Sequence, residues 1–186
     1  MDKHSDTNIV LKQGNLFFRK PCLDDVCDLL AVKNDTEAAL LLGGVYHQYT
    51  EQDIVNWINF HNSQADEVLF VVIDTDTGKV IGHAGLYKID SRIRRAEYGI
   101  LIGSKSSRGR GYGTRITSVI TNYGFTSLGL HKIKALVLKE NYPSLNMLRK
   151  CGYVEEGVLV DENYKNDRYY DVIIMSIINK ESLERI

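Results

Sequence analysis

The sequence is poor in cysteine, proline and long apolar runs. Its three cysteines, Cys22, Cys27 and Cys151, are an odd number without a CxxC pair, which argues against a disulfide framework and a standard zinc spacing. No apolar run approaches the roughly 20 residues of a membrane-spanning helix, and the N-terminus lacks the apolar core of a signal peptide. We therefore expect a soluble, cytoplasmic protein that holds no metal and does not enter a membrane.

Neither sign of charge predominates. The chain has 23 Lys and Arg residues against 24 Asp and Glu residues, a formal net charge of -1, and this balance argues against a nucleic-acid-binding protein. A local pair of arginines, Arg108 and Arg110, lies among glycines and needs a separate explanation. The sequence also lacks internal repeats and a Pro/Gly/Ser-rich linker, so we expect residues 1–186 to form a single domain.

The periodicity of apolar residues predicts an α/β domain. The predicted strands are 16–19, 68–73, 80–87, 96–102, 132–138, 153–160 and 169–177. The predicted helices are 24–33, 50–61, 113–128 and 141–151. Two of them have clear starts, the capping box at Thr50-Glu51-Gln52-Asp53 and the cap and proline at Asn141-Tyr142-Pro143. The order βααβββαβαββ predicts a mixed sheet of about seven strands flanked by about four helices.

A glycine-rich loop between a strand and a helix carries the strongest functional signal. The predicted strand ends with Ile100-Leu101-Ile102, and residues 103–107 follow it. Next comes Arg108-Gly109-Arg110-Gly111-Tyr112-Gly113-Thr114, where the helical period begins. Glycines let backbone N–H groups approach an anion, a helix N-terminus offers unpaired donors, and arginine adds charge-assisted hydrogen bonds. The expected ligand is a pyrophosphate.

The spacing of the loop argues against two common nucleotide-binding motifs. A Walker loop needs a lysine directly after its last glycine, and this loop has none. A dinucleotide-binding fingerprint needs GxGxxG after a strand of a parallel sheet, whereas Gly109, Gly111 and Gly113 have GxGxG spacing and follow antiparallel strands. A flexible surface loop with solvated arginines is the alternative that the loop alone leaves open.

The chain resembles the GNAT superfamily of N-acetyltransferases. Residues 108–113 match the [QR]xxGx[GA] pyrophosphate loop of that family, and Asn141, Ser144 and Arg149-Lys150-Cys151-Gly152-Tyr153 are similar to its second motif. Residues 155–157 and 166–171 resemble the C-terminal hairpin of the RimJ/RimL-like ribosomal-protein and spermidine acetyltransferases. The resemblance covers about residues 14–180, which we take as the core of the domain.

This resemblance implies a reaction and its partners. Acetyl-CoA would be the co-substrate, and a primary amine on a protein N-terminus, a polyamine or another small molecule would attack it directly in a ternary complex. Relatives of this type are commonly homodimers. A non-catalytic module that binds or senses acyl-CoA is the alternative function.

The resemblance also implies a binding site for acetyl-CoA. The edge of the strand at Ile100, Leu101 and Ile102 would pair with the pantetheine arm as an added strand would, and Asn141 would hold the arm from the other side. The residues implied at the pyrophosphate are Arg108, Gly109, Arg110, Gly111, Tyr112, Gly113 and Thr114.

Acetyl transfer to an ammonium group needs a base, and this chain offers two candidates. Glu97 lies in the strand that approaches the acyl site, although it could instead pair with Arg94 or Arg95. Glu162, expected in the loop before the last strand, is the second candidate, with plain surface charge as its alternative.

The acid that protonates the leaving thiolate is harder to assign. Many relatives have a tyrosine where this chain has Leu148, so that role cannot be transferred. Ser144 is the candidate acid, with Tyr142 as an alternative that no motif supports. Ser144 could instead satisfy backbone donors in the first helical turn, and a thiol of pKa near 8.5 can leave without an acid.

The acceptor is expected between the first helices and the last hairpin, at roughly residues 34–50 and 161–168. Four carboxylates there could attract a cation or serve as helix caps: Asp35, Glu37, Glu51 and Asp53. Structural roles are expected for His83, His131 and Cys151, which lack the spacing of a metal site or a nucleophile.

Overall fold

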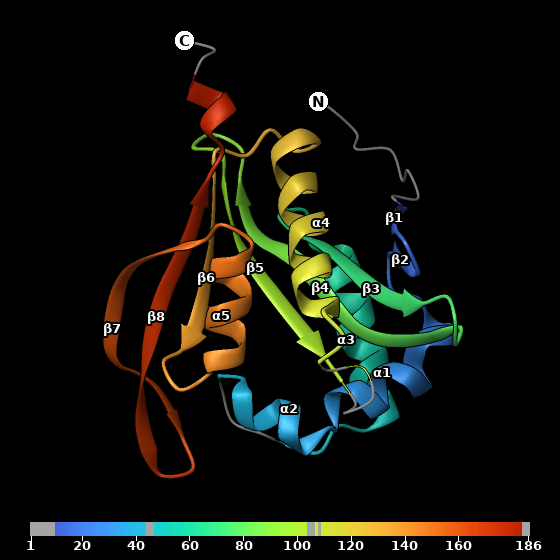
Figure 1. The fold of residues 1–186 in the computed structure, drawn as a ribbon. Coiled ribbons are helices and arrows are strands. Elements are labelled where there is room, and N and C mark those ends of the chain that lie inside the picture. The colour runs from blue at the N-terminus through green and yellow to red at the C-terminus, as the bar shows by residue number, and fades with distance from the viewer. Residues whose placement is uncertain (1–9, 44–46, 104–106, 108, 184–186) are drawn as a thin grey trace.

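A mixed sheet forms the centre of the computed structural model, which describes residues 10–43, 47–103, 107 and 109–183 (Figure 1). Within those residues, eight strands are hydrogen-bonded in the order β1-β2-β3-β4-β5-β6-β8-β7. The strands are β1 Leu11–Gln13, β2 Leu16–Arg19, β3 Val68–Asp74, β4 Lys79–Asp90, β5 Arg95–Ile102, β6 Lys132–Leu138, β7 Val154–Lys165 and β8 Arg168–Ile178. The helices are α1 Val26–Lys33, α2 Thr36–Leu41, α3 Glu51–Ser63, α4 Tyr112–Thr126 and α5 Tyr142–Lys150, with 3₁₀ turns at Leu23–Asp25 and Lys180–Leu183. The predicted α/β class is confirmed.

Helices cover both faces of the sheet, and β3 shows why the sequence requires this. Its run from Val68 to Ile73 is apolar throughout, so successive side chains need cover on opposite faces. Phe70 and Val72 are buried in the larger core, which includes residues of α4 and α5. Val71 is buried in a second core with residues of α1 and α3.

β5 and β6 separate after a short parallel pairing. Residues 95–97 of β5 pair with residues 132–134 of β6, and the two strands then diverge (Figure 1). β5 stays paired with β4 as far as Ile102. In the described part of the chain, the other edge of β5 has no strand partner from Tyr98 onward. Its main-chain groups on that edge are therefore available to a ligand.

The predicted helix starts at Thr50 and Asn141 are confirmed. The Thr50 hydroxyl accepts a hydrogen bond from the Asp53 N–H at 3.2 Å, and the Asp53 carboxylate accepts one from the Thr50 N–H at 2.8 Å. The Asn141 side chain accepts a hydrogen bond from the Ser144 N–H at 3.1 Å, with Pro143 in the first turn of α5. These local signals sufficed because each cap is made within four residues of sequence.

The prediction missed one strand and one helix among the described residues. β1 has three residues, which is too short for an alternating pattern to be recognised. α2 has six residues, and its N-cap is Asp35, whose carboxylate accepts a hydrogen bond from the Ala38 N–H at 2.8 Å. Asp35 is thus a cap, one of the two roles considered for it.

The last two strands are longer than predicted. β7 extends to Lys165 and β8 begins at Arg168, so Asn166 and Asp167 alone form the turn. Both have positive φ, 51° and 57°, as a two-residue turn between twisted strands requires. Glu162 therefore lies in β7, and its predicted position in a loop was wrong.

No described helix combines the length and the apolar character needed to cross a membrane.

Candidate functional site

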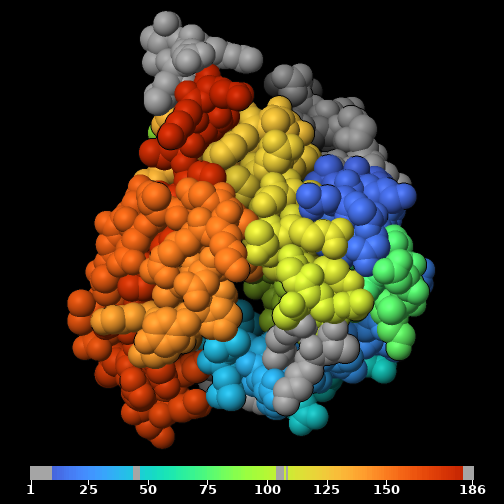
Figure 2. Space-filling model, viewed as in Figure 1, coloured from blue at the N-terminus to red at the C-terminus, as the bar shows by residue number. Residues whose placement is uncertain are grey.

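A cleft of about 450 Å³ lies beside the open edge of β5. Its walls come from four elements: Ala38 and Leu41 of α2, Ile100, Leu101 and Ile102 of β5, Gly111, Tyr112, Gly113 and Thr114 at the start of α4, and Asn141, Ser144 and Met147 at α5. In Figure 2 a furrow separates α5 (orange) from the start of α4 (yellow), with α2 (light blue) below it. The cleft thus brings together residues from both predicted cofactor-binding segments, whereas Arg108 lies outside the described residues.

The glycine-rich loop has the backbone of an anion cradle. Gly109 and Gly111 both have φ +74°, a conformation that side chains disfavour, and a Cβ at either position would meet no atom within 4 Å. Gly111 is the N-cap of α4 and provides no side chain to bond its first N–H groups. Those N–H groups and the positive end of the helix dipole are therefore available to a phosphate. A pyrophosphate fits this loop, because the side of the loop that faces the cleft presents backbone N–H groups rather than side chains.

Tyr112 anchors the loop. Its ring is buried, and its hydroxyl donates a hydrogen bond to Asp74 Oδ2 at 2.9 Å. Asp74, buried at the end of β3, also accepts a hydrogen bond from Asn15 at 3.1 Å. The Arg110 guanidinium lies 3.8 Å from the same carboxylate and remains half exposed. Tyr112 thus contributes backbone to the cleft, while its side chain fixes the start of α4 to the β3–β4 hairpin.

Glu97 lies outside this cleft. It lines a second pocket, of about 490 Å³, with residues of the turn between β4 and β5. Its carboxylate pairs with Lys88 at 3.1 Å and with Lys134 at 3.2 Å. Burial raises the pKa of this carboxyl, but the hydrogen bonds from the two lysines outweigh burial and leave the pKa below its ordinary value. The geometry therefore does not support Glu97 as the base, and its partners are lysines rather than Arg94 or Arg95.

Asn141 and Ser144 reach the cleft in different ways. The Asn141 amide donates a hydrogen bond to the Leu41 carbonyl at 2.8 Å while its oxygen caps α5. This side chain therefore joins α2 to α5. The sequence predicted only that Asn141 would contact the pantetheine arm, not that it would connect these two helices. Ser144 is only partly buried on the cleft wall. Leu148 is 1% exposed in the core, so it contributes nothing to the chemistry of the cleft.

Sequence reasoning missed Lys165, which holds α2 in place. Lys165 is 6% exposed, and its ammonium donates hydrogen bonds to the carbonyls of Leu40 at 2.6 Å and Leu42 at 2.8 Å. Together with Asn141 it satisfies the carbonyls that the last turn of α2 leaves unpaired. These contacts join residues 100 or more positions apart, so no local pattern could have identified them.

Replacing Lys165 with methionine is expected to loosen α2. The variant keeps a side chain of similar length but loses the charged donor, and the free energy of unfolding should fall by about 2 kcal/mol. Amide hydrogen exchange in residues 36–42 should become faster. Lys139→Met is the matched control, because Lys139 is half exposed and, among the described residues, its ion-pair partner is the carboxylate of Asp171. Equal exchange in the two variants would contradict this role of Lys165.

A metal site is not found in the ranges that the structure describes. There, no group of three or more His, Cys, Asp or Glu side chains is arranged to hold an ion.

Comparison with known proteins gives a consistent result. Residues 15–154 match the model of the acetyltransferase (GNAT) domain. An uncharacterized N-acetyltransferase, p20 of Bacillus licheniformis, is 33% identical over 130 residues, which are 70% of this chain and 72% of that protein. The spermidine N(1)-acetyltransferase of Vibrio cholerae is 37% identical over 127 residues, which are 68% of this chain and 72% of the enzyme.

The fold is similar to that of a solved enzyme from Vibrio cholerae. The crystal structure of spermidine N-acetyltransferase from Vibrio cholerae in complex with CoA and spermine superposes with a TM-score of 0.80 at 29% identity. The superposition covers 91% of this chain and 98% of that chain.

Proposed function

Because this chain belongs to the GNAT family of acetyltransferases, and so moves an acetyl group from acetyl-CoA to an amine, we propose that its acceptor is a small primary amine that attacks the thioester directly in a ternary complex. The observation that carries this proposal is the cleft, in which the open edge of β5 and the uncapped start of α4 lie on adjoining walls. One ligand with a peptide-like arm and a pyrophosphate suits both walls.

Different residues of the chain would bind different parts of acetyl-CoA. Gly109, Gly111 and the first turn of α4 would hold the pyrophosphate through backbone N–H groups, and Arg110 would add a positive charge. The edge of β5 at Leu101 and Ile102 would hydrogen-bond the pantetheine arm. A main-chain N–H on that edge would also face the thioester oxygen, where negative charge develops during attack.

This chain offers few groups that could protonate the leaving thiolate. Leu148 occupies the position where many relatives have a tyrosine, and Ser144 is the hydroxyl on the cleft wall that we retain as the candidate acid. A thiol of pKa about 8.5 is a tolerable leaving group without protonation. Exchange of Ser144 for alanine is the direct test of this assignment.

Relatives suggest which amines to test. The enzyme of Vibrio cholerae is named for spermidine, and its crystal structure contains spermine, so polyamines are the first class. Peptides with a free N-terminus are the second class, on the resemblance of the C-terminal hairpin to ribosomal-protein acetyltransferases. A cytoplasmic location is part of the proposal, because the three cysteines are free, as is usual in a reducing compartment. The predicted homodimer is tested by sedimentation of the full chain.

The decisive experiment measures release of the CoA thiol with a panel of amines. CoA binding is first confirmed by calorimetry, and acetyl-CoA is then mixed with polyamines, amino acids, amino sugars and short peptides. Release with one class of acceptor would support the proposal and identify the substrate class. CoA binding without release from any amine would instead favour the non-catalytic module that senses acyl-CoA.

A further inference from the structure

Three walls of the cleft meet at one buried side chain, that of Thr117. Thr117 lies in the second turn of α4 and is fully buried. Its hydroxyl donates a hydrogen bond to the Gly113 carbonyl at 2.8 Å and lies 2.9 Å from the hydroxyl of Tyr98 in β5. The same hydroxyl is 3.5 Å from the sulfur of Met147 in α5. β5, the first turn of α4 and α5 all line the cleft, and all three contact Thr117.

The directions of these two hydrogen bonds follow from what each atom can do. A carbonyl oxygen only accepts, so the single hydrogen of the Thr117 hydroxyl is used on Gly113. The Tyr98 hydroxyl must then be the donor to Thr117. Tyr98 is 6% exposed, and burial raises the pKa of its phenol well above the ordinary value, so the donor hydrogen stays in place. A continuous chain of hydrogen bonds thus runs from β5 through Thr117 to the start of α4.

Tyr98 stands at the point where β5 loses one of its two neighbouring strands. The parallel pairing with β6 ends at Glu97, whereas Tyr98 is paired with Leu86 of β4. In the described part of the chain, β5 is held by a strand on one edge only from this residue onward, and the cleft lies beside its other edge. The bond from the Tyr98 hydroxyl to α4 is therefore a second, independent restraint on the free part of the strand.

Close packing at Gly113 brings the same elements together. A Cβ on Gly113 would lie 2.7 Å from the Met147 sulfur and 3.7 Å from a methyl carbon of Ile102. α5 and the end of β5 therefore approach the first turn of α4 more closely than a side chain would permit. Apolar packing has no preferred direction, whereas a hydrogen bond does. Packing thus keeps the walls in contact, and the bonds of Thr117 fix how they are aligned.

Resting on the proposed function, we infer that Tyr98 and Thr117 are positioning residues for acetyl-CoA, which hold the edge of β5 at the distance from the start of α4 that the ligand spans. The pantetheine arm lies along β5 and the pyrophosphate at α4, so one molecule binds both walls. Two linked groups bind more tightly than separate ones only when their sites already match the span of the linker. The Tyr98–Thr117 chain keeps the sites at that span in the free protein, and so contributes to affinity by preorganisation.

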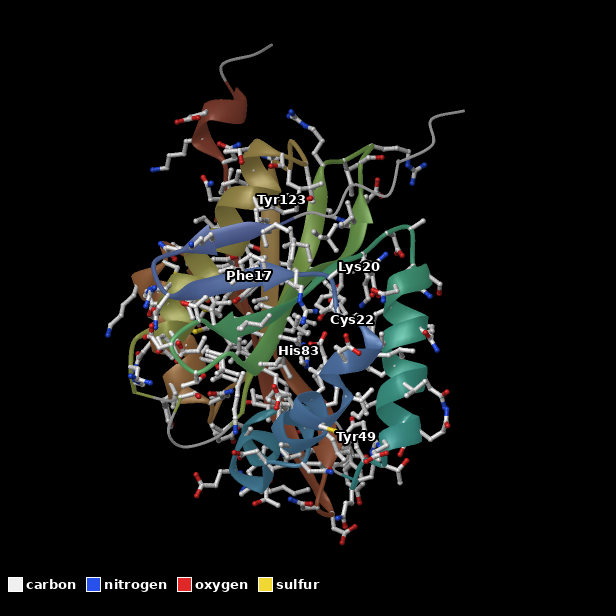
Figure 3. All side chains as sticks on the ribbon, turned by 90° about the vertical axis from the view of Figure 1, so that its right-hand side faces the viewer. Phe17, Lys20, Cys22, Tyr49, His83 and Tyr123 are labelled. Atoms are coloured by element: carbon white, nitrogen blue, oxygen red, sulfur yellow. The ribbon has the colours of Figure 1, made fainter. Side chains whose placement is uncertain are left out.

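The same helix provides a matched pair of residues away from the cleft. Thr121, one turn after Thr117, is also buried, and its hydroxyl lies 2.8 Å from that of the buried Tyr153. Thr117 bonds a residue of the cleft wall, whereas Thr121 and Tyr153 are not among the described residues that line the cleft. Figure 3 shows Tyr123, two residues after Thr121, near the end of α4 that is far from its start. The two threonines thus share chemistry and burial but differ in their connection to the cleft.

The first test compares Thr117→Val with Thr121→Val. Valine has the shape of threonine without the hydroxyl, so each variant loses one buried bond to a tyrosine, and each unfolding midpoint should fall by about 2–4 °C. In calorimetry, Thr117→Val should bind CoA about 10-fold more weakly, whereas Thr121→Val should bind it as the wild type does. Thr117→Ser keeps the hydroxyl and should recover most of the affinity, although it loses a buried methyl group and stability. Equal CoA affinity in the two valine variants would overturn the inference.

The second test asks whether the two side chains act as one chain, and it remains decisive if Thr117→Val fails to fold. Tyr98→Phe removes a hydroxyl and keeps the ring, and it should also weaken CoA binding about 10-fold. Wild-type affinity in Tyr98→Phe would overturn the inference. The double variant of Tyr98→Phe and Thr117→Val should bind CoA about as either single variant does, because each change alone breaks the chain. Losses that multiply to about 100-fold would show two independent effects and contradict the chain. A wild type that binds no CoA would overturn the proposed function itself.

Discussion

Replacing Gly111 with glutamate is expected to abolish CoA binding and leave the fold intact. Gly111 is the N-cap of α4, and its φ of +74° turns the loop so that the next N–H groups face the cleft. A carboxylate placed there competes for the same donors and repels the pyrophosphate. Each lost hydrogen bond to a charged group contributes about 1.5–3 kcal/mol, so the loss of two predicts at least a 100-fold weaker affinity.

Calorimetry on the folded variant measures this effect, and the chain provides a matched control. Gly129, just beyond the far end of α4, has φ +63° and, like Gly111, open space where a Cβ would project. Gly129→Glu therefore introduces the same backbone strain and the same charge about 20 Å or more from the cleft. CoA should bind this control as it binds the wild type. Equal affinity in the two variants would show that the loop does not hold the pyrophosphate.

The loop was predictable because its chemistry is local. The positive φ of Gly109 and Gly111 and the start of α4 come from consecutive residues, so the glycine spacing was enough to predict them. That the loop holds a pyrophosphate stays a prediction. The base was not predictable in the same way. Whether Glu97 faces a cleft or an ion pair depends on the strand register and on Lys134, which lies in another strand. No sequence pattern around Glu97 contains that information.

The position of α2 shows the same limit. The sequence prediction missed this helix, although Asp35 was considered as a cap, and its place beside the cleft depends on Lys165 and Asn141, which reach it from distant parts of the chain. His83 is a further case, since the sequence does not show that its ring nitrogens lack a hydrogen-bond partner among the described residues. Residues that act through tertiary contacts thus require the structure, while caps, turns and phosphate loops do not.

Gly82 in β4 lies close against the backbone of β5, and Gly82→Ala is expected to impair both stability and turnover. The residue is buried and pairs with Ile102. A Cβ added to it would lie 2.2 Å from the Leu101 carbonyl oxygen and 3.0 Å from the Ile102 Cα. These are backbone atoms that no rotamer change can move, so β5 must shift away from β4. Overpacking of this kind lowers the free energy of unfolding by about 1–3 kcal/mol.

The same shift should reduce turnover more than it reduces CoA binding. The glycine-rich loop is anchored separately through Tyr112 and Asp74, whereas a displacement of about 1 Å in β5, the strand proposed to face the thioester, can slow the reaction about 100-fold. Gly157→Ala in β7 is the matched control, since a Cβ there meets no atom within 4 Å, and its stability should stay within about 0.5 kcal/mol of the wild type. Chemical denaturation and steady-state kinetics measure both effects. If Gly82→Ala matched Gly157→Ala in both stability and turnover, the close contact between β4 and β5 would have no part in placing the thioester. The open edge of β5 would then no longer explain catalysis.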